Sequence, residues 1–125
     1  MEEQLGDGDP DVSNILNRIG TLYIEMDQFN DAESAFKRAL LIREKKLGED
    51  HSRVAQTLKH MVSLYEMQEN YDDAIQVGRR ALEISKKIFG DSSVQVAQIY
   101  MRLGVIYMVA ERKNEAREVL RNALT

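Results

Sequence analysis

The stretch that decides the fold reads ALLIREKKLG and covers residues 39–48. A related stretch, ALEISKKIFG, covers residues 81–90, which lie 42 positions further along the chain. The same shift superimposes residues throughout the sequence and needs no insertion. The aligned columns include Val12, Val54 and Val96; Tyr23, Tyr65 and Tyr107; Ala32, Ala74 and Ala116; and Ala39, Ala81 and Ala123. We conclude that the chain contains three copies of a 42-residue unit.

Within each unit the spacing of apolar residues is helical. Val12, Leu16, Ile19 and Tyr23 fall on one helical stripe, and a second stripe follows the polar residues at 27–28. The pattern predicts helices over residues 12–26 and 30–47, 54–68 and 72–89, and 96–110 and 114–124. We expect the second helix of each pair to have an N-cap at Asn30, Asp72 or Asn114. We expect helices to end at Gly48 and Gly90, where glycine can adopt positive φ.

Composition limits the classes of function. The 125 residues suit one domain, 1–125, and the 43% hydrophobic and 30% charged residues are typical of a folded, water-soluble protein. A net charge of −4 argues against nucleic acid or an anionic membrane as the main partner. The absence of cysteine, of an apolar run of ~20 residues and of a basic leader is compatible with the cytoplasm, where we expect the protein. No arrangement of residues suggests a nucleophile with its base, so we expect neither an enzyme nor a cofactor.

The alternation of small and large residues resembles the tetratricopeptide repeat (TPR) family. The residues that carry this resemblance are Leu16, Ile19, Gly20, Tyr23, Ala32, Phe36 and Ala39 in the first unit; Leu58, Met61, Val62, Tyr65, Ala74, Gly78 and Ala81 in the second; and Tyr100, Leu103, Gly104, Tyr107, Ala116, Leu120 and Ala123 in the third. The 42-residue length is similar to that of the kinesin light chain subtype. The resemblance implies an all-α, right-handed α-solenoid of three antiparallel helix-turn-helix repeats, with six helices, that binds another protein.

Some positions depart from the family pattern. Asp27, Glu69 and Glu111 stand where the turn between the two helices usually has glycine. We expect these turns either to avoid the left-handed conformation or to carry roughly 1 kcal/mol of strain. In the second unit, we expect the bulk of Val62 to fill part of the space that Gly78 leaves empty. Lys113 replaces the aromatic residue of the other two turns, so we expect the third turn to be the least well packed.

The resemblance also implies that the first helix of each unit lines a concave groove for a peptide. The candidate groove residues are Asn14, Asn17, Arg18, Thr21, Gln56, Lys59, His60, Ser63, Gln98, Met101, Arg102 and Val105. Within this set, Arg18, His60 and Arg102 share one column of the repeat and predict a basic line that prefers an acidic segment. Glu25 and Glu66 lie nearby and cancel part of its field. The alternative is that these are solvated surface residues without a dedicated partner.

Three more specific kinds of site match poorly. A carboxylate clamp, as in the chaperone-binding members of the family, is matched by Arg102, but Asn17 and Thr21 stand where lysine and asparagine are expected. Residues 7–11 begin like an EF-hand loop, yet Val12 replaces its glycine and Arg18 its glutamate. The two histidines, His51 and His60, lack the spacing of a helical zinc pair. We therefore expect no metal site.

The ends of the chain suggest a further hypothesis. Residues 5–6 align with residues 47–48, which sets the repeats at 6–47, 48–89 and 90–125, the third with a truncated second helix and no capping helix. The chain then resembles a segment of a longer array, or one whose apolar end is covered by another copy. The alternatives to a peptide-binding adaptor are therefore a structural module that self-assembles through its uncapped ends, possible as a homo-oligomer, and a regulatory segment of a larger multidomain protein.

Overall fold

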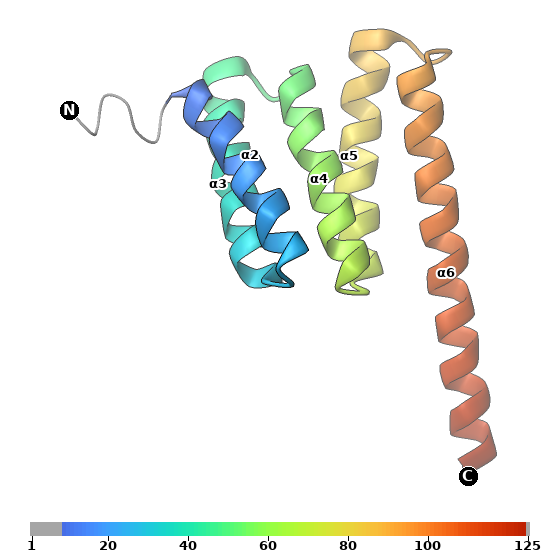
Figure 1. Cartoon of the computed structure of the whole chain (residues 1–125). Coiled ribbons are helices and arrows are strands. Elements are labelled where there is room, and N and C mark those ends of the chain that lie inside the picture. Colours follow the sequence, from blue (N-terminus) through green and yellow to red (C-terminus); the bar gives the residue numbers. More distant parts are fainter. Residues whose placement is uncertain (1–8, 125) are drawn as a thin grey trace.

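The computed structural model describes residues 9–124, and its side chains are described up to residue 122. The five helices in this range are α2 (Pro10–Glu25), α3 (Phe29–Leu47), α4 (Ser52–Met67), α5 (Tyr71–Phe89) and α6 (Val94–Leu124), and the range holds no strand. Figure 1 shows that α2 and α3 form one antiparallel hairpin and that α4 and α5 form a second beside it. The all-α prediction is confirmed.

The start of each hairpin is fixed by local capping. Asp9 accepts a hydrogen bond from the Asp11 backbone N–H at 2.9 Å, and Pro10 occupies the first turn of α2. In the second hairpin, His51 Nδ1 accepts from the Arg53 backbone N–H at 3.1 Å. These caps begin α2 and α4 two residues earlier than the apolar pattern alone predicted.

Both hairpin turns use a left-handed residue that is not glycine. Asp27 and Glu69 each have φ 59°. In the first turn the backbone N–H groups of Asp27 and Gln28 donate to the carbonyls of Ile24 and Tyr23, at 3.0 and 2.8 Å. The second turn repeats this pattern, which is a Schellman motif. The turn therefore adopts the strained alternative that the sequence left open.

This tight turn leaves no room for the predicted N-caps. After the left-handed residue, one further residue leads into the helix, so α3 starts at Phe29 and α5 at Tyr71. The capping residues are Gln28 and Asn70, and neither side chain makes a capping hydrogen bond. The prediction of N-caps at Asn30 and Asp72 was wrong. At the other end of these helices, Gly48 and Gly90 have φ of 95° and 88°, as predicted.

The small residues allow close approach within each hairpin. Ala32, Ala39, Ala74 and Ala81 are fully buried. A Cβ atom on Gly20 would lie 2.6 Å from the ring of Phe36, so no larger residue fits there without displacing the ring. A Cβ on Gly78 would lie 2.7 Å from Leu103 of α6 and 3.5 Å from Val62. The space beside Gly78 is thus taken mainly by Leu103 rather than by Val62.

The third unit differs from the prediction. The two helices expected at 96–110 and 114–124 are one continuous helix, α6, so the described residues form five helices and not six. Asn114 consequently lies inside α6 instead of capping a helix. Figure 1 shows the second half of α6 extending beyond the other four helices. The turn expected in the third unit, in which Glu111 would have to adopt the left-handed conformation, is therefore absent.

The chemistry at residue 113 accounts for this difference. Phe29 and Tyr71 are partly buried against the core at the start of the second helix of their hairpins. Lys113 has no apolar ring to bury in the corresponding place, and its ammonium group forms an ion pair with Glu69 in the turn between α4 and α5. The helix therefore continues, because it keeps its backbone hydrogen bonds and loses no aromatic contact by doing so.

The strain at Asp27 gives a test of the turn. We expect Asp27→Gly to raise the free energy of unfolding by about 1 kcal/mol, because glycine adopts positive φ without a Cβ penalty. Met26→Gly is the matched control: Met26 has φ −93°, so glycine there should lower stability by a few tenths to about 1 kcal/mol. Urea unfolding followed by circular dichroism measures both changes. Equal effects of the two variants would contradict the assignment of strain to Asp27.

Candidate functional site

A pocket of about 560 Å³ lies between the first two units. We call it the α2–α4 pocket; its lining residues are Asn14, Asn17, Arg18, Thr21, Leu22, Arg43, Gln56 and His60. Six of these eight are predicted groove residues, and Leu22 and Arg43 are additions. Three of the lining residues are basic and none is acidic. The helices α2 and α4 thus bring predicted groove residues from two units to one concave site.

Arg43 lies at the base of this pocket. Its side chain is on α3, and the residue is only 1% exposed. Within the first hairpin the guanidinium donates from Nε to Ser13 Oγ at 2.9 Å and from Nη2 to Asn14 Oδ1 at 2.7 Å. It joins this hairpin to the second through Nη1, whose two N–H groups are shared among Arg53 O at 2.8 Å, Thr57 Oγ1 at 3.0 Å and Gln56 Oε1 at 3.1 Å.

The positive charge of Arg43 has only neutral acceptors. No carboxylate in the described part of the chain forms an ion pair with it. Burial lowers the pKa of Arg43, and repulsion from Arg53 lowers it further. An arginine side chain nevertheless stays protonated in a protein. The α2–α4 pocket therefore has a fixed positive charge beneath it, in surroundings that screen charge less than water does.

Asn17 also contacts the guanidinium of Arg43. It is 6% exposed, so it is buried rather than displayed in a groove. With its amide oxygen turned toward the guanidinium, Asn17 accepts from Arg43 Nη1 at 2.7 Å and from Nη2 at 3.1 Å. The backbone carbonyl of Asn17 accepts from Thr21 Oγ1 at 3.0 Å. Of the predicted groove residues on α2, Arg18 is the exposed cation.

His60 is half-buried at the side of the pocket. Its ring stacks on Phe36, with a centroid distance of 5.6 Å and an interplanar angle of 3°. Burial lowers the pKa of His60 below its usual value of 6.5, and the positive charges of Arg43 and Lys59 lower it further. His60 is therefore neutral at pH 7 and does not extend the basic line that the sequence predicted.

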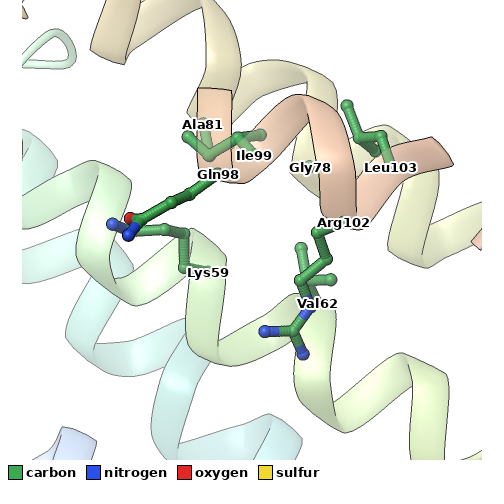
Figure 2. A pocket seen from close by; sticks show the side chains of 8 residues that line it. All are labelled: Lys59, Val62, Gly78, Ala81, Gln98, Ile99, Arg102 and Leu103. Atoms are coloured by element: carbon green, nitrogen blue, oxygen red, sulfur yellow. The ribbon is translucent and has the colours of Figure 1, made fainter. Parts of the chain in front are cut away.

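Arg102 lies in a second pocket, of about 270 Å³, between the second unit and α6. We call it the α4–α6 pocket; Figure 2 shows its lining residues, Lys59, Val62, Gly78, Ala81, Gln98, Ile99, Arg102 and Leu103. Arg102 donates to Glu66 Oε1 from Nε at 3.0 Å and from Nη2 at 2.5 Å, and to Ser63 Oγ at 2.7 Å. Its charge is thus largely compensated by Glu66.

A third pocket, of about 450 Å³, continues the groove toward the loops at one end of the helices. We call it the end pocket; it is lined by Asn14, Ser52, Arg53, Ala55, Gln56, Lys59, Ser85, Phe89 and Gln95. Lys59 lines this pocket and the α4–α6 pocket, so it links the two. In Figure 2 the tips of Lys59 and Gln98 reach toward one another between α4 and α6. The remaining groove candidates, Met101 and Val105, are 73% and 57% exposed on α6.

The residues with described placement contain no group of three His, Cys, Asp or Glu side chains that is able to hold a metal ion. The first two positions of the EF-hand-like stretch at 7–11 lie outside the described residues. In the same part of the chain, no helix combines the length and apolar character needed to cross a membrane.

Comparison with known proteins identifies the repeat. The sequence matches the family model described as tetratricopeptide repeat over residues 11–87 and again over 61–125. The chain belongs to the tetratricopeptide repeat family. A search of curated proteins found no match for this TPR chain.

A solved structure shows the same fold. The structure of BtubC (BKLC) from P. vanneervenii matches with a TM-score of 0.77 and 23% sequence identity, over 94% of this chain. This TPR chain spans 50% of the length of that protein. At 23% identity this likeness shows the shared fold, and the kinesin light chain-like subtype stays a prediction from the 42-residue period.

Arg43 is a pocket residue that the sequence patterns above did not single out. A basic residue near the end of α3 also suits the helix dipole, so its type alone does not indicate burial. The spacing of Phe36, Ala39 and Arg43 places all three on the buried stripe, which was the available signal. The second unit has Ser85, also buried, at the same position of the repeat. The buried charge is therefore specific to the first unit of this TPR chain.

Removing the Arg43 side chain should weaken the contact between the two hairpins and so lower the stability of the chain. We expect Arg43→Ala to lower the free energy of unfolding by about 3 kcal/mol, because it leaves several buried acceptors on α2 and α4 without a donor. The exposed Lys45 on the same helix is the control, and Lys45→Ala should change stability by less than about 0.5 kcal/mol. Denaturant unfolding measures both. A stability of Arg43→Ala equal to that of the unaltered chain would contradict a clamping role.

His60 should make stability depend on pH. Its pKa is lowered in the folded state, so the unfolded chain binds more protons near pH 6. The contribution of neutral His60 is complete above about pH 6.5 and is lost as the pH falls through its folded pKa. We therefore expect His60→Gln to reduce the loss of stability between about pH 7.5 and 5. Thermal unfolding across this range tests it, and parallel curves for the two proteins would refute the assignment.

Proposed function

We propose that this TPR segment is a protein-interaction module that binds an acidic peptide along the face formed by α2 and α4. One observation carries the proposal. The α2–α4, α4–α6 and end pockets together are lined by five cationic side chains and no carboxylate, although the chain carries a net charge of −4. These cations are Arg18, Arg43, Arg53, Lys59 and Arg102, and the neutral His60 lies among them.

The chemistry of the face fits a carboxylate-rich segment. Arg18 and Lys59 are exposed cations that can reach a peptide lying in the groove. A guanidinium binds both oxygens of a carboxylate, and an ammonium group binds as a point charge. Beneath them, the buried charge of Arg43 adds an attraction that costs no further ordering, because its side chain is already fixed. An acidic segment therefore gains more on this face than a neutral one.

We expect the peptide to bind mainly at the first two units, and not equally along the column formed by Arg18, His60 and Arg102. Arg102 already forms an ion pair with Glu66, so a ligand carboxylate has to compete with a carboxylate of the protein. Arg18 and Arg43 have no such competitor within the α2–α4 pocket. We therefore assign the principal contact to the first two units, and a smaller contribution to the third. The proposal assigns the segment no catalytic step and no cofactor.

A second candidate function is self-association through α6. This candidate rests on the apolar residues that α6 exposes. Those that are at least half exposed include Tyr100, Met101, Val105, Met108, Val119 and Leu120. Contiguous exposed apolar residues mark interaction surfaces in soluble proteins. This surface lies on α6 and is distinct from the basic face of α2 and α4, so both functions are compatible with one chain.

A peptide-binding measurement tests the principal proposal. Fluorescence anisotropy compares a labelled Glu-rich peptide with a peptide of the same length in which every Glu is replaced by Gln. We expect the Glu-rich peptide to bind at least about tenfold more tightly, a difference of about 1.4 kcal/mol. The preference should weaken as salt is raised, because exposed charges are screened.

Variants locate the binding face. We expect Arg18→Glu and Lys59→Glu each to weaken binding of the Glu-rich peptide about tenfold or more, and Arg102→Glu to weaken it less. Lys45→Glu makes the same charge change at an exposed position of α3 that lines none of the three pockets. Equal weakening by Lys45→Glu, or equal binding of the two peptides, would overturn the proposal.

A further inference from the structure

The face of α6 that its own unit should cover is bare. In α4, Leu58, Val62 and Tyr65 are 1%, 3% and 5% exposed, and Val62 lies beside Gly78 of α5. Their counterparts 42 positions later are Tyr100, Gly104 and Tyr107. Gly104 is exposed, and Tyr100 and Tyr107 are 50% and 42% exposed although they contact Lys86 and Arg79 of the preceding helix α5. The covering helix of the third unit is therefore missing from its place.

The glycines show this most directly. In the first unit a Cβ on Gly20 would strike the ring of Phe36, which lies on the opposite helix of the hairpin. At Gly104, the corresponding glycine of the third unit, no atom lies within 4 Å of such a Cβ. The counterpart of Phe36 is Leu120, which is 62% exposed. Both members of the close contact are thus present in the third unit, and neither has its partner.

A single α6 cannot bring these residues together. Gly104 and Leu120 are 16 residues apart in one continuous helix, which separates them by about 24 Å along its axis. The residues suited to the bare face are therefore those of the second half of α6, supplied by another chain. The first two hairpins show what covers this face: the second helix of the same repeat.

We propose that two copies of this chain pair through α6 by exchanging residues 112–124. Each copy lays the second half of its α6 on the first half of the other, in the place where α3 lies on α2. Because each chain has one bare face and one extended segment, the exchange is reciprocal and closes as a two-fold dimer. The inference deepens the self-association proposed above and is independent of peptide binding by the groove.

The register of the first hairpin fixes the pairs. Placing Leu120 of one copy on Gly104 of the other puts the two-fold axis near residue 112. Val105 then meets Val119 of the second copy, and Met108 meets Ala116 of the second copy. All four of these residues are exposed in the structure. The same register sets Glu111 opposite Lys113 of the second copy, which also pairs with Glu69 of its own chain, and it brings the two exposed Arg112 residues together at the axis.

Mass and turn chemistry form the first arm of the test. We expect the 125-residue chain to be a dimer by analytical ultracentrifugation at micromolar concentration. Glu111→Gly places a residue free to adopt positive φ where Asp27 and Glu69 have φ 59°. It should favour the closed hairpin and raise the dimer dissociation constant at least about tenfold. Glu111→Ala, which keeps α6 helical, should leave the dimer intact. Monomeric unaltered chain would overturn the proposal.

Single cysteines test the exchange itself, since the chain has none of its own. A Met108→Cys chain is mixed with an Ala116→Cys chain of different mass, unfolded and refolded together, and mildly oxidised. We expect a disulfide-linked heterodimer. Glu118→Cys replaces Ala116→Cys as the control, because residue 118 lies on another face of the helix and should yield far less heterodimer. A dimer that gives equal yields with both would show association without exchange and would overturn the inference.

Discussion

The close approach of two helices inside each hairpin is the constraint on which the rest of this structure depends. Phe36 presses on Gly20 with no space for a Cβ atom between them. This contact requires the chain to reverse within a few residues, which Asp27 and Glu69 achieve in the left-handed conformation. Only after that reversal does each hairpin present a continuous apolar face to the next one, and the groove arises from the stacking of these hairpins.

The contact between hairpins links stability to recognition. Arg43 is buried among neutral acceptors from α2 and α4, so its charge holds the first two units together without being neutralised. The same charge lies beneath the α2–α4 pocket. A carboxylate partner within the protein would have stabilised the guanidinium more strongly, but it would also have removed the field on which the proposed binding of an acidic segment depends. The neutral acceptors keep both properties.

The third unit shows what happens when the hairpin constraint is not met within one chain. Lys113 contributes no aromatic ring to the turn and forms an ion pair with Glu69, and α6 continues as one helix. The two halves of the third unit are then held apart, each with an exposed apolar face. The groove of the first two units is unaffected, since none of the residues that line the α2–α4 pocket comes from α6. The proposed binding face and the proposed dimer contact therefore lie in different parts of the repeat array.

The sequence by itself determined the 42-residue period, the helical class, the four helices of the first two units and the glycines that end α3 and α5. These features follow from local spacing, because a periodic apolar stripe records which side of a helix is covered. It also indicated six of the eight residues that line the α2–α4 pocket. Their roles as ligand contacts stay predictions.

Only the tertiary structure decided how the charges are used and where the last helix ends. Arg102 is compensated by Glu66, which lies 36 residues away in sequence, and the pKa of His60 is lowered by burial and by cations on α3 and α4. Asn17 and Arg43 are buried against each other across two helices. The continuation of α6 depends on a competition between a strained turn and an unbroken helix. Such outcomes depend on contacts between distant residues, and a local pattern of residue types does not encode them.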